Sequence, residues 1–333
     1  MGGLYKFYHN IFGVNMDAKQ VFSALQSSMA EHIIGQAHLT NRLLVALLAD
    51  GHLLVEGAPG LAKTRAIQAL SEHIEGDFHR VQFTPDLLPS DLTGVEVYRP
   101  QDGSFHFQKG PLFHNLVLAD EINRAPAKVQ AALLEAMAER QITVGRTSYP
   151  LPDLFLVMAT QNPIEQEGTY PLPEAQLDRF LLHVTMDYPD AASEQKILQL
   201  SRTEASTKPK KPEVLLHQDT LFQARQEALN IHVAPQLETY IVQLMMATRA
   251  NHTQTGVVKH LQYGASPRAT IALDRCARAH AWLDGRDFVA PEDIQSMALD
   301  VLRHRLLLNY EAEASGLTTD DVIHQLIAEV PVP

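Results

Sequence analysis

The chain has 333 residues, of which 45% are hydrophobic and 20% are charged, as in an ordinary soluble globular protein. This length favours two domains over one, because a single hydrophobic core stops growing well before this size. The formal net charge of -12 argues against tight nonspecific binding of nucleic acid, since an acidic surface repels phosphate backbones. No apolar run approaches the roughly 18 residues that a membrane span requires.

The cysteine and histidine content indicates the cellular compartment and bears on whether the protein holds a metal. Cys276 is the single cysteine and cannot form an internal disulfide. Because the first residues also carry no signal-peptide pattern, we expect a protein of the reducing cytoplasm. The 16 histidines are scattered without the spacing of a metalloprotease or a zinc site, which argues against a metal held by protein ligands alone.

The first half of the chain has the pattern of an α/β domain. Residues 1–30 are expected to form an N-terminal arm and a helix. Beyond them, short apolar runs alternate with helix-period stretches such as 63–74 and 128–139. The alternation predicts a parallel five-stranded sheet with helices on both faces, within a domain of residues 31–188. The predicted strands are residues 52–56, 78–83, 115–119, 153–159 and 181–184.

Two insertions interrupt this alternation. Residues 92–110 alternate around an Asp102-Gly103 turn, which predicts a β-hairpin before the third strand. Residues 141–152 predict a second hairpin before the fourth strand. Three aromatic residues on the first hairpin, Tyr98, Phe105 and Phe107, either project away from the domain or pack against it.

The second half of the chain is predicted to be helical. Residues 189–218 include a Lys-Pro-Lys-Lys-Pro run at 208–212 and are expected to be a linker. Helical periodicity then continues to the end of the chain, which predicts an all-helical domain over residues 219–333. Its clearest helical stretches are residues 236–251, 267–284 and 291–308.

A glycine- and proline-rich run follows the first predicted strand and opens a helix. Such a loop can hold phosphates with its backbone N–H groups and the helix N-terminus. Lys63 would reach the β- and γ-phosphates, and the Thr64 hydroxyl would hold Mg²⁺. Ala62 replaces the usual glycine and fits if its backbone is right-handed; a ligand-free loop is the alternative. The run is Gly57-Ala58-Pro59-Gly60-Leu61-Ala62-Lys63-Thr64.

Polar residues end the third and fourth predicted strands. Asp120 and Glu121 follow an apolar run, which would place Asp120 beside a metal and let Glu121 polarise an attacking water. Asn162 follows the next strand, at the edge where open α/β sheets bind ligands, and could orient that water. The alternatives are an ordinary buried strand that ends in acids and an Asn-Pro turn.

Together these residues resemble the AAA+ ATPases, and in detail the MoxR group. The resemblance covers most of the chain, from about residue 35 to 305, and implies a P-loop AAA+ core with a C-terminal helical lid. It also implies ATP hydrolysis with Mg²⁺. The matching segments are residues 56–64, 83–94, 119–126, 159–163, 172–180 and 264–270.

The resemblance assigns roles that spacing alone does not. Arg179 matches the arginine finger, which would reach the ATP of a neighbouring subunit and accelerate hydrolysis roughly a thousandfold or more; a surface pair with Asp178 is the alternative. Arg268 matches sensor 2 at the start of a capped lid helix, and would approach the γ-phosphate in its own subunit unless it merely faces solvent. Gly35 and Gln36 resemble the segment near the adenine. Arg124 could act as a further interface arginine.

The family further implies a homo-oligomeric ring, usually a hexamer, and a partner with a von Willebrand factor A domain. The client would be a protein matured by remodelling. A magnesium-chelatase-like motor is an alternative function, but it would need larger insertions than these hairpins. A DNA translocase would want a basic hairpin, whereas residues 95–107 contain Arg99 together with Glu96 and Asp102. A nonhydrolysing scaffold would have no need for the intact catalytic residues.

Overall fold

A parallel five-stranded sheet forms the centre of the first domain. The structure is a computed structural model that describes residues 17–101, 103–163, 168–206, 214–249 and 256–333. The strand order is β2-β5-β8-β1-β9, and every neighbouring pair is parallel, which confirms the predicted sheet. All five carboxyl ends therefore lie at one edge of the sheet, and all amino ends at the other. The strands are β1 (Leu53–Gly57), β2 (Phe78–Gln82), β5 (Leu116–Asp120), β8 (Leu156–Gln161) and β9 (Leu182–Met186).

Helices cover both faces of the sheet because successive residues of a buried strand point to opposite sides. Leu53 and Val55 belong to one hydrophobic core, whereas Leu54 between them belongs to a second. On the first face lie α2 (Ala18–His32), α3 (Ala37–Leu48) and α4 (Lys63–His73). On the second face lie α5 (Pro89–Thr93), η1 (Pro111–Phe113), η2 (Ile122–Arg124), α6 (Ala127–Glu139) and α7 (Glu174–Leu177).

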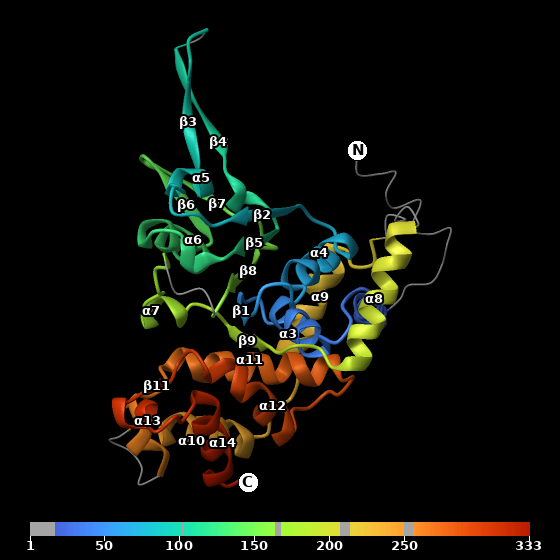
Figure 1. The fold of residues 1–333 in the computed structure, drawn as a ribbon, viewed down its shortest axis with the longest axis vertical. Helices are drawn as coiled ribbons and strands as arrows, with labels where there is room; N and C mark the ends of the chain where they lie inside the picture. The colour runs from blue at the N-terminus through green and yellow to red at the C-terminus, as the bar shows by residue number, and fades with distance from the viewer. Residues whose placement is uncertain (1–16, 102, 164–167, 207–213, 250–255) are drawn as a thin grey trace.

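Both predicted hairpins are present, and one of them extends far from the sheet (Figure 1). Gly94 at the base of the first has φ +98°, and a Cβ there would meet the carbonyl oxygen of Gln108 at 2.2 Å. No other residue type fits this position without a shift of the backbone. Asp102 of the expected turn lies outside the described residues. The first hairpin consists of β3 (Gly94–Arg99) and β4 (Ser104–Lys109), and the second of β6 (Gln141–Val144) and β7 (Thr147–Pro150).

The aromatic residues of the first hairpin divide into two groups. Phe107 stacks on Tyr149 of the second hairpin, with ring centroids 4.2 Å apart and planes at 20°. Tyr98 and Phe105 contact each other but are 53% and 67% exposed. The base of the hairpin is therefore packed against its own domain, while its outer part presents aromatic rings to the surface.

The segment expected to be a linker contains a helix, α8 (Ala191–Ser206), which differs from the expectation for residues 189–218. Most described side chains of α8 are exposed, so the helix buries little apolar surface. Figure 1 shows it standing at the side of the domain. The Lys-Pro run at 208–212 and the expected arm over residues 1–15 lie outside the described residues.

The C-terminal domain is mostly helical, but it also contains a small antiparallel pair, β10 (Leu261–Tyr263) with β11 (Leu307–Leu308). The expectation of an all-helical domain is corrected in this respect. The predicted helix 291–308 ends at Leu302, because the chain then turns and Arg303 and Arg305 donate to backbone oxygens of the sheet domain. The remaining elements are α9 (Gln218–Leu229), α10 (Pro235–Ala247), η3 (Gly256–His260), α11 (Pro267–Leu283), α12 (Pro291–Leu302), α13 (Tyr310–Ala314) and α14 (Thr319–Glu329).

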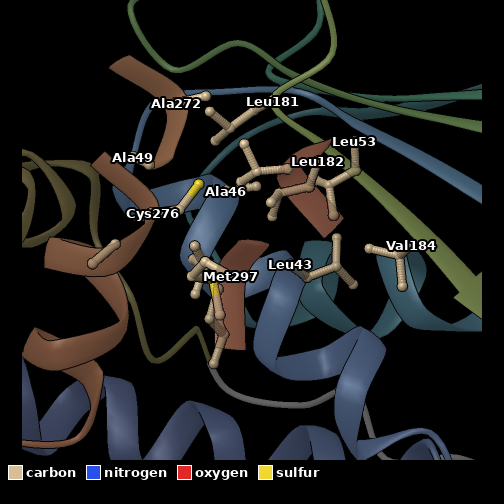
Figure 2. Packing of buried hydrophobic residues seen from close by; sticks show 14 of the residues in the cluster. Leu43, Ala46, Ala49, Leu53, Leu181, Leu182, Val184, Ala272, Cys276 and Met297 are labelled. Carbon is tan, nitrogen blue, oxygen red and sulfur yellow. The ribbon is translucent and has the colours of Figure 1, made fainter. Parts of the chain in front are cut away.

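The helical domain and the sheet share one continuous core (Figure 2). Cys276 of α11 and Met297 of α12 are fully buried in the same cluster as Leu43 of α3 and Leu182 of β9. Burial raises the pKa of the Cys276 thiol to about 12. A buried ion pair of 2.6 Å between Arg42 and Asp300 also joins α3 to α12. Within the described residues, no helix combines the length and apolar character needed to cross a membrane.

Candidate nucleotide-binding and hydrolysis site

The loop between β1 and α4 forms one wall of a pocket of about 350 Å³ at the carboxyl edge of the sheet. Ala62 has φ 59° and ψ 21°, the left-handed conformation, so the right-handed backbone under which alanine was expected to fit is not present. The turn from the loop into α4 requires this conformation, which costs a residue with a Cβ roughly 1–2 kcal/mol. The residues that line the pocket are Pro59, Gly60, Leu61, Ala62, Lys63, Thr64, Arg65, Asp120, Glu121 and Asn162.

Lys63 lies across the ends of two strands. Its Nζ donates to the carbonyl oxygen of Gly57 at 2.6 Å and to that of Gln161 at 3.0 Å. Thr64 follows on the first turn of α4 and lines the same pocket. The sequence run predicted this cluster, and the structure brings Lys63 and Thr64 together with Asp120, Glu121 and Asn162.

Asp120 is buried at the end of β5, and both of its carboxylate oxygens accept hydrogen bonds. The Thr160 hydroxyl donates to Oδ1 at 2.6 Å. Arg80 of β2 donates to Oδ2 twice, from Nη2 at 2.6 Å and from Nε at 3.1 Å. The adjacency of β2 and β5 brings Arg80 to this carboxylate.

Glu121 occupies a left-handed position with φ 58° just after β5. Its backbone N–H donates to the Thr160 hydroxyl oxygen at 2.9 Å. Its side-chain Oε2 accepts from Gln82 Nε2 at 2.8 Å and from Arg124 Nη1 at 3.2 Å. Arg124 therefore pairs with the acid of its own subunit. Asn162 lines the same pocket and is 5% exposed.

Gly35 and Gln36 lie where the chain leaves β9, at the carboxyl edge. Gly35 has φ +79° and a Cβ there would lie 3.0 Å from that of Ser193. Gln36 donates from Nε2 to the carbonyl oxygen of Asp187 at 3.1 Å. Neither is among the described residues that line the phosphate pocket. Their expected contact with the adenine stays a prediction.

The expected arginine finger, Arg179, and the expected sensor-2 arginine, Arg268, lie at the opposite, amino edge of the sheet. Arg179 precedes β9, and its Nη1 donates to the carbonyl oxygen of Leu134 at 2.7 Å. Arg268 is the second residue of α11, where the Ser266 side chain caps the helix as expected. Its Nη1 lies 3.8 Å from Asp178 Oδ2, and its side chain is 59% exposed.

This position does not fit the expectation that Arg268 reaches the γ-phosphate within its own subunit. Five strand residues span about 17 Å, and α11 lies at the amino ends of the strands. Neither Arg268 nor Arg179 is among the described residues that line the phosphate pocket. Instead the two line a second pocket, of about 340 Å³.

The second pocket is strongly basic although the chain as a whole is acidic. Five arginines and one aspartate line it, so it carries a formal charge of about +4 from these groups alone. His52 also lines it, and burial followed by the charge of Arg140 lowers the pKa of His52 to about 3. A pocket of this charge suits a polyanion. The charged residues are Asp50, Arg140, Arg179, Arg268, Arg275 and Arg305.

Known proteins match the chain over both domains. A family model described as ATPase family associated with various cellular activities (AAA) matches residues 52–182, and an AAA lid domain model matches residues 253–326. The chain is 44% identical to the chaperone MoxR1 of Mycobacterium tuberculosis, over 90% of this chain and 79% of that protein. It is 32% identical to the protein MoxR of Methylorubrum extorquens, over 95% of this chain and 96% of that protein. The chain belongs to the MoxR family of AAA ATPases.

A solved structure agrees with this assignment. The crystal structure of a candidate ATPase from Cytophaga hutchinsonii matches with a TM-score of 0.87 and 43% identity, covering 95% of this chain and 96% of that one. The expected family, fold class and type of enzyme are thus confirmed. As a member of the MoxR family, the chain binds ATP and hydrolyses it.

The donor set of this MoxR-family site fits a magnesium ion. Thr64 offers a hydroxyl oxygen and Asp120 a carboxylate, and Mg²⁺ prefers oxygen ligands together with those of the nucleotide phosphates. The pairing of Asp120 Oδ2 with Arg80 shows that this carboxylate oxygen can take a cation. These two residues would hold the ion beside the phosphates.

Sequence reasoning missed Arg80, Gln82 and Thr160, three residues that contact the carboxylates of Asp120 and Glu121 in this MoxR-family site. Arg80 and Gln82 alternate along β2 and so share one side of that strand. Their contacts depend on β2 lying next to β5, an order that the sequence pattern does not reveal. Thr160 follows an apolar strand run and was detectable as a buried polar residue two positions before Asn162.

Proposed function

We propose that this MoxR-family ATPase hydrolyses Mg²⁺-ATP at sites shared between neighbouring subunits, and uses the resulting motion to remodel a protein client. The opposite placement of the two pockets carries the proposal. Lys63, Asp120 and Glu121 lie at the carboxyl edge of the sheet, and Arg179 and Arg268 at the amino edge. The arginines of one subunit therefore complete the site of the next.

The residues of the carboxyl edge divide the work of hydrolysis. The backbone of the loop and Lys63 bind the phosphates, and Thr64 and Asp120 would hold Mg²⁺, which would supply charge neutralisation at the phosphates. Glu121 accepts a proton from the attacking water, and the Asn162 amide orients that water. The neighbour's Arg179 and Arg268 stabilise the charge that develops on the transferred phosphoryl group.

The remodelling role is supported by relatives and by the first hairpin. The relative from Mycobacterium tuberculosis is described as a chaperone. Exposed Tyr98 and Phe105 give β3–β4 an apolar contact surface that could hold an unfolded segment. We further propose a hexameric ring in the cytoplasm and a partner with a von Willebrand factor A domain, both on family grounds.

The decisive experiment mixes two inactive variants. Arg179→Ala removes the arginine that a subunit donates, and Glu121→Gln removes the acid of the site that it hosts. Each alone is expected to lose at least about a hundredfold in ATPase rate, in line with the roughly thousandfold effect of an arginine finger. Mixing them restores part of the activity, because an Arg179→Ala subunit can receive Arg179 from a Glu121→Gln neighbour.

Steady-state ATP hydrolysis at several protein concentrations provides the readout. The rate per wild-type subunit rises with concentration if sites are shared. Arg202→Ala, an exposed arginine on α8, serves as the charge-matched control and keeps the wild-type rate. A mixture that stays inactive, or a rate independent of concentration, would show that the site is complete within one subunit. Stimulation by DNA would favour a translocase instead.

A further inference from the structure

The metal-binding carboxylate is already paired with a cation from its own chain. Arg80 holds Asp120 Oδ2 with two donors, at 2.6 and 3.1 Å, and Thr160 holds Oδ1 at 2.6 Å. The Asp120 side chain is only 11% exposed, whereas that of Arg80 is 50% exposed. The carboxylate is thus fixed in place, while its guanidinium partner borders open solvent.

A magnesium ion and this guanidinium compete for the same oxygen. Oδ2 accepts two hydrogen bonds from Arg80, which use the directions that a metal ligand would need. Two cations beside one carboxylate also repel each other, and they do so more strongly where water is partly excluded. The half-exposed guanidinium can move into solvent at low cost, since water replaces its hydrogen bonds.

We propose that Arg80 gates the metal position, by neutralising Asp120 before nucleotide binds and leaving Oδ2 when Mg²⁺ binds. Arg80 thereby sets the Mg²⁺ concentration at which the enzyme loads nucleotide. The inference rests on the proposed function, because it takes Asp120 to be a metal ligand. Arg80 is in this sense a positioning residue that acts through Asp120.

When Arg80 leaves Asp120, the hydrogen bonding of Glu121 changes as well. Arg80 Nη2 donates to Gln82 Oε1 at 3.2 Å, and Gln82 Nε2 donates to Glu121 Oε2 at 2.8 Å. These two hydrogen bonds fix the orientation of the Gln82 amide while Arg80 is in place. Once Arg80 leaves, Gln82 is free to rotate and Glu121 loses a fixed partner. Metal loading and the freeing of Glu121 for water are thus linked.

The test measures binding instead of turnover. Binding of a nonhydrolysable ATP analogue is followed by calorimetry as Mg²⁺ is raised from micromolar to millimolar concentration. Arg80→Ala is expected to lower the half-saturating Mg²⁺ concentration about fivefold, the size of effect expected for a half-exposed ion pair. Arg80→Lys keeps a charge but loses the paired donors, so it gives an intermediate value and covers the case in which the alanine variant folds poorly.

Two controls separate gating from a merely structural role. Arg146→Ala removes an equal charge from the exposed β6–β7 turn and leaves the Mg²⁺ requirement unchanged. In an Asp120→Asn background, Arg80→Ala has no further effect on that requirement. An unchanged or raised Mg²⁺ requirement in Arg80→Ala would overturn the gating role. If the wild-type protein bound no analogue at any Mg²⁺ concentration, the proposed function itself would fail.

Discussion

Ala62 holds the left-handed conformation that the loop needs where α4 begins. Glycine adopts such an angle without steric cost, whereas alanine there is strained. The chain nevertheless keeps a Cβ at this position, directly before Lys63, the lysine that we propose binds the phosphates. The loop is therefore less stable than its sequence pattern alone would indicate.

Replacing Ala62 with glycine is expected to raise the stability of the nucleotide-free protein by about 1 kcal/mol, because the strain is removed. For a protein of this size that amounts to a rise of about 2 °C in the thermal midpoint. Gly60→Ala provides the opposite control, since Gly60 has φ +86° and alanine there introduces strain. A midpoint that falls in Ala62→Gly would contradict this account.

His52 connects protonation to the stability of the sheet. It is buried, its Nδ1 accepts the backbone N–H of Val157 at 3.0 Å, and its pKa is lowered to about 3. Burial likewise lowers the pKa of His304 well below 6.5. In the unfolded chain both histidines titrate near 6.5, so below that pH the unfolded state binds protons that the folded state does not.

Stability should therefore be greatest above about pH 6.5 and fall as the pH is lowered from there toward 3. Each neutral histidine contributes a slope of about 1.4 kcal/mol per pH unit in this range. His52→Gln keeps an acceptor for the Val157 N–H but cannot titrate, so its thermal midpoint should fall less between pH 7 and pH 5. Equal slopes in the two proteins would exclude His52 as a source of the pH dependence.

At the scale of elements, the sequence predicts the sheet well and the helices outside its core less well. Strands β1, β5 and β8 are short, mostly apolar runs buried in the interior, whereas the edge strand β2 carries polar residues and is partly exposed. The sequence did not predict helix α8, because most of its side chains are exposed and it has no apolar face to give a helical pattern. Helix α12 ends at Leu302 although apolar residues continue to Leu308, since Arg305 binds Asp178 and β11 pairs with β10. Such contacts link residues far apart in sequence, which local periodicity does not report.

The two hairpins are joined through Phe107, which stacks on Tyr149 and meets the edge of Phe113 at 5.7 Å. Phe107→Ala should remove a contact worth about 1 kcal/mol beyond its buried area. Backbone amides in both β3–β4 and β6–β7 should then exchange hydrogen for deuterium faster. Phe105→Ala, which truncates an exposed ring, should leave β6–β7 unchanged. Unaltered exchange in β6–β7 of Phe107→Ala would mean that the hairpins are independent.

At the scale of the whole molecule, the sequence grouped the residues of the candidate nucleotide site but did not predict where the arginines lie relative to them. Motif order placed Lys63, Asp120, Glu121 and Asn162 in one pocket, because each lies at or after the carboxyl end of a strand of the same parallel sheet. The position of Arg268 depends on how the helical domain packs against the sheet. That packing is set by a shared core and by the buried pair of Arg42 with Asp300, neither of which is a local pattern.

The placement of the two pockets at opposite edges of the sheet gives each subunit a direction. In the proposed assembly every contact is head to tail, and such contacts either close into a ring or continue as a filament. An open row keeps one terminal subunit whose nucleotide lacks arginines and another whose arginines meet no nucleotide. Closing the row removes both unmatched ends at once and adds one working site without adding a subunit. Opening the ring at one subunit interface would therefore abolish hydrolysis at that interface and leave the other interfaces active.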